Sequence, residues 1–230
     1  GKPLIIIFGL GSANGSRTGA SPLAEMMENL TKKPNISVIT CMGNEANNKC
    51  HYKGTVMSAL VPDVMEINVD GTGKGFTMEI WADSLDILSV SIESPSGEYV
   101  PRIPARMGAS MEYTFLYEGS TVTVDYQITE NVAGMEVIFV RLKTPVEGTW
   151  KFYIYSLTNI KGSYNAWLPL KQFSGQDIYF LKSDPDTTLT VPAAADGVIS
   201  VGAYNHYTGA AYYESCLLYT SPSPRDAHES

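Results

Sequence analysis

The feature that most constrains the fold is a change of hydrophobic period along the chain. In the middle of the sequence, apolar and polar residues alternate in short segments that Gly, Pro, Asp and Ser turns separate. These segments begin at Met65, Phe76, Leu88, Tyr113, Val122, Met135 and Trp150. Alternation is the period of a strand with one buried face, and no helical stripe interrupts the series. Residues 53–183 are therefore predicted to form an antiparallel β-sandwich or jelly roll.

The residues before this region follow a different pattern. Leu4–Phe8 is apolar at every position, which is typical of a parallel strand that is covered on both faces. Apolar residues then recur at helical spacing between Ser21, a suitable cap, and Pro34, which ends the helix. Ile36–Ile39 begins a second apolar strand, so residues 1–52 are predicted to form a βαβ unit.

Residues 184–215 contain one more apolar, Gly-containing segment, Val198–Ala203, which favours a return to the same layer. The predicted fold class is thus α/β, with a partial parallel sheet and helices interrupted by an all-β jelly-roll or β-sandwich insertion. The predicted parts are 1–52 and 184–215 for the α/β core and 53–183 for the insertion.

Residues 216–230 do not continue any of these patterns. Reverse translation of Cys216–Asp226 with suitable codons resembles a transposase-type sequencing adapter. We therefore expect 216–230 to be an artefactual read-through tail and the chain to be truncated at both ends, as a metagenomic fragment would be. A genuine Pro/Ser-rich tail is the alternative.

Charge and hydropathy exclude several classes of function. The chain has 16 Lys and Arg against 24 Asp and Glu, which gives a formal net charge of -8. Nucleic-acid binders usually carry a basic patch, and a membrane span needs about 18 consecutive apolar residues, which this sequence lacks. We predict no nucleic acid and no membrane span. The compartment stays open between the cytoplasm, the spore and secretion.

No metal or cofactor site is predicted. His51 and His206 have no acid, nucleophile or second histidine at a motif spacing. Cys41 and Cys50 lie nine residues apart without a second pair, and one Asp-x-Asp pair at Asp184 offers too few oxygens for calcium.

Small and polar residues follow both apolar strands of the first part. Gly9-Leu10-Gly11 comes after the first strand, and Gly43-Asn44-Glu45 comes at the end of the second. The carboxyl ends of parallel strands meet at one sheet edge, where functional residues gather. An Asn there could donate its amide N–H to a developing negative charge, or it could be a turn residue in a left-handed conformation. The tripeptide by itself leaves both interpretations open.

Taken in order, these segments resemble a subtilisin-like serine peptidase (subtilase). The position of the β-rich insertion is similar to that of the jelly-roll domain in bacterial, clostridial Csp-type germination proteases. The matching motifs are Gly43-Asn44-Glu45, Ser94-Pro95-Ser96-Gly97, Pro101–Arg106, Asp184–Thr190 and Val201–Asn205. The resemblance implies a subtilisin-like parallel sheet for the α/β part and covers residues 1–215.

The resemblance also implies a serine-type endopeptidase that hydrolyses protein or peptide substrates by acyl-enzyme chemistry, with its own prodomain as a further partner. The family's catalytic Asp, His and Ser match no residue of this chain, so it implies that the fragment alone is inactive. By residue, it assigns the oxyanion hole to Asn44, substrate-backbone pairing to Gly9, Leu10 and Gly11, and the wall of the S1 pocket to Cys41, Met42 and Gly43.

Two alternatives belong to other classes. One is a non-catalytic β-sandwich binding module, in which aromatic residues would form a platform for sugars. Its candidate residues are Trp81, Trp150, Tyr153, Tyr155 and Trp167. The other alternative is a pseudoprotease scaffold, which would hold other residues at the triad positions.

Overall fold

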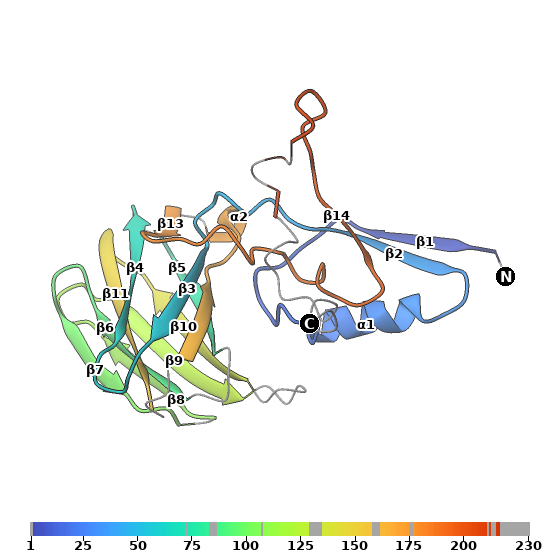
Figure 1. Cartoon of the computed structure of the whole chain (residues 1–230). Helices are drawn as coiled ribbons and strands as arrows, with labels where there is room; N and C mark the ends of the chain where they lie inside the picture. The colour runs from blue at the N-terminus through green and yellow to red at the C-terminus, as the bar shows by residue number, and fades with distance from the viewer. Residues whose placement is uncertain are drawn as a thin grey trace. The chain divides into compact units, whose positions relative to one another are not determined.

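A computed structural model of the chain describes residues 2–71, 73–82, 87–106, 108–128, 135–157, 162–174, 177–210, 212 and 215–216. Of the expected read-through tail, residues 217–230 lie outside the described residues. The chain divides into two compact units, Gly1–Asn48 with Pro185–Ser230, and Lys49–Asp184 (Figure 1). Neither described helix combines the length and hydropathy that crossing a bilayer requires.

The first unit holds a three-stranded parallel sheet of order β1-β2-β14. Its elements are β1 (Leu4–Phe8), α1 (Pro22–Thr31), β2 (Ile36–Cys41) and β14 (Ile199–Val201). The helix begins where the sequence predicts, because the Ser21 hydroxyl accepts a hydrogen bond from the Ala24 N–H at 3.2 Å. Ala24 and Met27 are its buried residues, and the helix packs against β2.

The prediction that the strands of this sheet are covered on both faces is wrong for the two edge strands. In β1, Leu4 is 51% exposed, Ile5 64% and Ile7 75%, and in β14 both Ile199 and Val201 are exposed. Strands that are covered on both faces usually have unbroken apolar runs. Such a run does not by itself show that other elements of the chain cover the strand.

The second unit contains two antiparallel sheets and the four-residue helix α2 (Lys171–Ser174). One sheet has the order β3-β12-β5-β10-β9-β8 and the other the order β13-β4-β11-β6-β7. The strand bounds are β3 His51–Val56, β4 Asp63–Asp70, β5 Gly75–Ala82, β6 Leu88–Glu93, β7 Tyr99–Ile103, β8 Ser110–Thr114, β9 Thr121–Ile128, β10 Glu136–Lys143, β11 Gly148–Ser156, β12 Gly162–Trp167 and β13 Asp177–Phe180.

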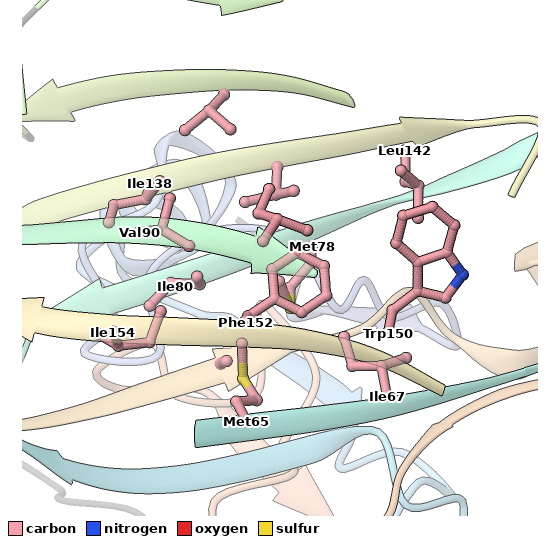
Figure 2. Close-up of a cluster of buried hydrophobic side chains, with 14 of the residues drawn as sticks. Met65, Ile67, Met78, Ile80, Val90, Ile138, Leu142, Trp150, Phe152 and Ile154 are labelled. Carbon is pink, nitrogen blue, oxygen red and sulfur yellow. The ribbon is translucent and has the colours of Figure 1, made fainter. Parts of the chain in front are cut away.

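One hydrophobic core joins the two sheets of this unit. Alternate residues of β4, β5 and β11 point into it, including Met65, Met78 and Phe152 (Figure 2). Trp150 is the largest fully buried side chain; its indole N–H donates to the Val146 carbonyl at 3.1 Å, and Phe115 meets it edge-on with ring centroids 5.1 Å apart. The apolar residues of the alternating segments therefore fill this core, because successive side chains of a strand point to opposite faces.

The predicted fold class, an α/β subtilisin-like parallel sheet with helices interrupted by an all-β insertion, is wrong. The chain is mainly β: eleven of the fourteen described strands lie in the two antiparallel sheets. An α/β layer structure needs helices on the faces of its sheet. Of the two helices in the described residues, only α1 packs on the parallel sheet, and it has ten residues. The βαβ unit forms too small a share of the chain to set the fold class.

Limited proteolysis is expected to leave a resistant fragment close to residues 49–184. This unit has its own core, and its ends are hydrogen-bonded together: the Phe180 N–H donates to the Lys49 carbonyl and the Asp184 N–H to the His51 carbonyl, each at 2.9 Å. Mass spectrometry of a trypsin and chymotrypsin time course would identify the fragment. Equal cleavage rates inside and outside 49–184 would contradict an independently stable unit.

Candidate functional site

The ends of β1 and β2 lie at the same edge of the parallel sheet. The two strands pair in register from Leu4 with Ile36 to Phe8 with Thr40. Gly9, Leu10 and Gly11 therefore leave the sheet beside Cys41, Met42 and Gly43. Strand β14 joins them on the other side of β2, where the Met42 N–H donates to the Val201 carbonyl at 3.1 Å. In the described part of the chain β1 pairs only with β2, so it is an edge strand, and Gly9 and Leu10, which follow it, are exposed.

A third segment ties these two strand ends together. The Ser12 N–H donates to the Val191 carbonyl at 3.0 Å, and the Val191 N–H returns a bond to the Ser12 carbonyl at 2.9 Å. On its other side, the Thr190 N–H donates to the Met42 carbonyl at 3.0 Å. Residues 190–191 therefore lie between the chain that leaves β1 and the chain that leaves β2.

The side chain of Thr190 packs against two glycines, one from each strand end. A Cβ at Gly11 would overlap the Thr190 hydroxyl, and a Cβ at Gly43 would lie 2.6 Å from Thr190 Cγ2. Gly43 also has a φ of 104°, which other residues rarely adopt. Both glycines are thus required by close packing, and Gly43 is required by its backbone conformation as well.

Gly43→Ala is expected to lower the free energy of unfolding of the first unit by about 2–4 kcal/mol, because it adds both an overlap and a strained φ. Gly9→Ala is the matched control: no atom lies within 4 Å of a Cβ at that position, and its φ is not positive. We expect it to change the stability by less than about 0.5 kcal/mol. Urea unfolding of both variants measures the difference, and equal effects would contradict the close packing described here.

Asn44 follows Gly43 and is exposed. The turn after it is held by Asn48, whose side-chain amide donates to the Asn44 carbonyl at 3.3 Å and to the Glu45 carboxylate at 2.9 Å. Within the described residues, no hydrogen bond involves the Asn44 side-chain amide itself. Asn44 is thus exposed at the end of β2, and Asn48 holds the turn that follows it.

The other residues of the predicted S1 wall differ in their surroundings. Met42 is buried in a small cluster with Leu189, Ala193 and Cys216, so its side chain fills the interior of this unit. Cys41 is half-buried. The Cys216 thiol donates to the Thr188 carbonyl at 3.0 Å, and burial raises the pKa of this thiol.

Thr190 was not predicted as a site residue. The sequence signal for it is indirect: two glycines at strand ends indicate that another group approaches both closely. Nothing in the sequence says that the approaching group is a side chain almost 150 residues further on, since the contact depends on the return of the chain to the sheet.

His51 and the aromatic candidates lie in the Lys49–Asp184 unit, whereas His206 lies in the first unit, where its ring centroid is 3.7 Å from that of Tyr207. His51 is fully buried, with Nδ1 3.1 Å from the Asp184 carbonyl and Nε2 2.9 Å from Asn165 Oδ1, and its ring stacks on Trp167. Trp81, Trp150 and Trp167 are all buried, so they do not offer exposed ring faces to a sugar. Tyr153 and Tyr155 are half-buried. Among the described residues, no group of three or more His, Cys, Asp or Glu side chains is placed to hold a metal ion.

Comparison with known proteins finds similarity among solved structures. No family model matches the chain, and no curated protein matches it. Among solved structures, the chain is similar to the CspB protease of Clostridium perfringens, with 25% sequence identity and a TM-score of 0.82. The match covers 93% of this chain and 44% of the protease chain, so this chain spans less than half the length of that neighbour. The similarity supports a Csp-like subtilase fold and a relationship to peptidases.

Proposed function

We propose that the unit formed by Gly1–Asn48 and Pro185–Ser230 is the substrate-binding and oxyanion-stabilising part of a subtilisin-like serine endopeptidase. The observation that supports this proposal is that β1 and β2 end at the same edge of the parallel sheet, with exposed Gly9 and Leu10 after one strand and exposed Asn44 after the other. The similarity to CspB protease supports the same reading. The substrate is a protein or peptide, no nucleic acid takes part, and the enzyme's own prodomain is a further partner of this edge.

The two parts of the edge have different tasks. An extended peptide can pair with the chain segment that follows β1, because strand addition supplies backbone hydrogen bonds without regard to sequence. Gly9, Leu10 and Gly11 provide that backbone. When a nucleophile attacks the peptide carbonyl, negative charge develops on its oxygen, and the Asn44 side-chain N–H donates a hydrogen bond that strengthens as the charge grows.

The catalytic Asp, His and Ser are proposed to lie in the part of the enzyme that this chain does not span. CspB protease is more than twice as long as the region matched, which leaves room for them. The chain by itself is then expected to bind an extended peptide and not to hydrolyse it, because the members of the triad act as a unit.

Peptide binding to the 15N-labelled chain tests the proposal. Titration with an acetylated, amidated tetra-alanine peptide is expected to shift the backbone signals of Gly9, Leu10 and Gly11 and the side-chain amide signal of Asn44. The control is the same peptide N-methylated at alternate residues, which cannot pair with a strand and should cause no shift. Shifts confined to residues 49–184, or no shift at saturating peptide, would contradict the proposed site.

A further inference from the structure

We propose that the outer face of one β-sheet in the Lys49–Asp184 unit binds an uncharged, extended oligosaccharide. The face belongs to the sheet of order β13-β4-β11-β6-β7. The binding side chains form a tyrosine platform on β6, β7 and β11, which consists of Glu93, Tyr99, Arg102, Lys151, Tyr153 and Tyr155. This site is separate from the proposed peptidase edge, which belongs to the other unit.

Strand β6 is buried on both of its faces, although only one face meets the core. Leu88, Val90 and Ile92 are core residues, so Ser89 and Ser91 point the opposite way. These two serines are 1% and 0% exposed. The side chains that reach them come from the neighbouring strands β7 and β11. The tyrosine platform is therefore a layer of long side chains that covers the outer face of β6.

The tyrosines of the platform are bonded to the sheet through their hydroxyl groups. The Tyr99 hydroxyl donates to the Ser91 oxygen at 2.7 Å, and the Ser91 hydroxyl donates to the Tyr155 oxygen at 3.4 Å. The Tyr153 hydroxyl donates to the Glu93 carboxylate, and the Tyr153 ring meets Tyr99 edge-on with centroids 5.9 Å apart. Because the Tyr99 hydroxyl is held by a fully buried serine, the exposed 48% of this residue is mainly ring.

Arg102 fixes the platform before any ligand arrives. Its Nε donates to the Ser89 hydroxyl at 2.6 Å, and its guanidinium lies 4.6 Å from the centre of the Tyr155 ring. Its Nη1 and Nη2 donate to the carbonyls of Ala59 and Ser156, at 3.4 and 3.5 Å. Side chains that are already ordered lose little rotamer freedom on binding, which favours a ligand that makes many weak contacts.

The charges of this face are balanced, which favours an uncharged ligand. Lys151 forms an ion pair with Glu93 at 2.8 Å and lies opposite Glu66 in the strand register. Arg102 brings the charges to two positive and two negative. Such a surface produces little long-range field to attract a charged polymer. Sugars match it instead, because their C–H groups pack on aromatic rings and their hydroxyl groups form hydrogen bonds with charged side chains at the rim.

A proline-rich peptide is the competing ligand, since it also packs on aromatic rings. Its backbone carbonyls need donors, but the hydroxyl groups of Tyr99 and Tyr153 already donate within the protein. A sugar needs the ring rather than the phenol proton, so these tyrosines favour the sugar.

Titration of the 15N-labelled chain with cellohexaose, N-acetylchitohexaose and maltohexaose tests the proposal. At least one of them is expected to shift the backbone signals of Tyr99 and Tyr153. Tyr99→Ala and Tyr153→Ala should each weaken its binding at least about tenfold. The dissociation constant should change less than about twofold between roughly 0.05 and 0.5 M NaCl, because the sugar carries no charge.

Tyr117→Ala is the matched control, because Tyr117 is an exposed tyrosine outside the platform. This variant should bind the sugar as tightly as the unchanged protein. The proposal is wrong if none of the three sugars shifts the platform signals at millimolar concentration, or if both platform variants keep the original affinity with an unchanged urea midpoint. Shifts of the same signals by decaproline, without any by the sugars, would also overturn it in favour of a proline-rich peptide.

Discussion

Replacing Asn44 by Ala, in an enzyme that joins this chain to a complete Asp–His–Ser triad, is expected to lower kcat by roughly 10²–10³-fold, the magnitude known for the oxyanion-hole Asn of subtilisin. KM should change little, because the hydrogen bond that is lost forms mainly in the transition state. Asn44 is exposed and its side-chain amide has no hydrogen bond to the described residues, so the variant removes no internal contact of that group. Steady-state kinetics on a peptide substrate give both constants.

Asn47→Ala provides the comparison for this effect. Asn47 is also an exposed asparagine and lies three residues further along the same loop. Its replacement is expected to change kcat less than about twofold, as for a surface substitution away from the site. If Asn44→Ala raises KM and leaves kcat unchanged, Asn44 binds the ground state only, and the assignment of the oxyanion hole is wrong.

Trp150→Ala is expected to have the largest effect on stability, with a loss of about 3–5 kcal/mol in the free energy of unfolding of the Lys49–Asp184 unit. The side chain is fully buried between the two antiparallel sheets (Figure 2). Its removal leaves a cavity, takes away the edge-on partner of Phe115, and deprives the Val146 carbonyl of its indole donor. The midpoint of urea unfolding, followed by tryptophan fluorescence, measures the loss.

Tyr117→Ala is the control for this second variant. Tyr117 is also aromatic and lies in the turn after Phe115, but it is 84% exposed. We expect a change below about 0.5 kcal/mol. A small effect of Trp150→Ala, comparable with that of Tyr117→Ala, would mean that the two sheets do not share a tightly packed core.

The strands of the β-rich region could be predicted wherever their residues alternate. The segments that begin at Met65, Phe76 and Leu88 lie within β4, β5 and β6. Strands β3, β7, β12 and β13 were not predicted. In β3 and β12, His51–Val56 and Gly162–Trp167 contain buried polar or small residues that break the simple alternation. Tyr52 of β3 and Tyr164 of β12 are both buried, and both hydroxyls donate to the Asp63 carboxylate, at 2.9 and 2.8 Å.

The candidate site could be predicted in part. Both strand ends and the Gly43-Asn44 pair were found from the sequence, since an apolar run followed by glycine and a polar residue is a local signal. The predicted α/β fold class was wrong. The apolar runs identify strands of a parallel sheet, but they do not show that this sheet contains only three of the fourteen described strands. Local patterns report the element in which a residue lies and carry little information about the number of elements packed around it.

The sequence by itself determined which residues alternate, where the helix is capped, and which short loop places an asparagine after a glycine. Only the tertiary structure decided that Thr190 returns between Gly11 and Gly43, that Met42 is directed inward, and that the apolar residues of β1 are exposed. The physical reason is the range of the interactions: capping and strand periodicity act over a few residues, whereas close packing joins segments far apart in the chain.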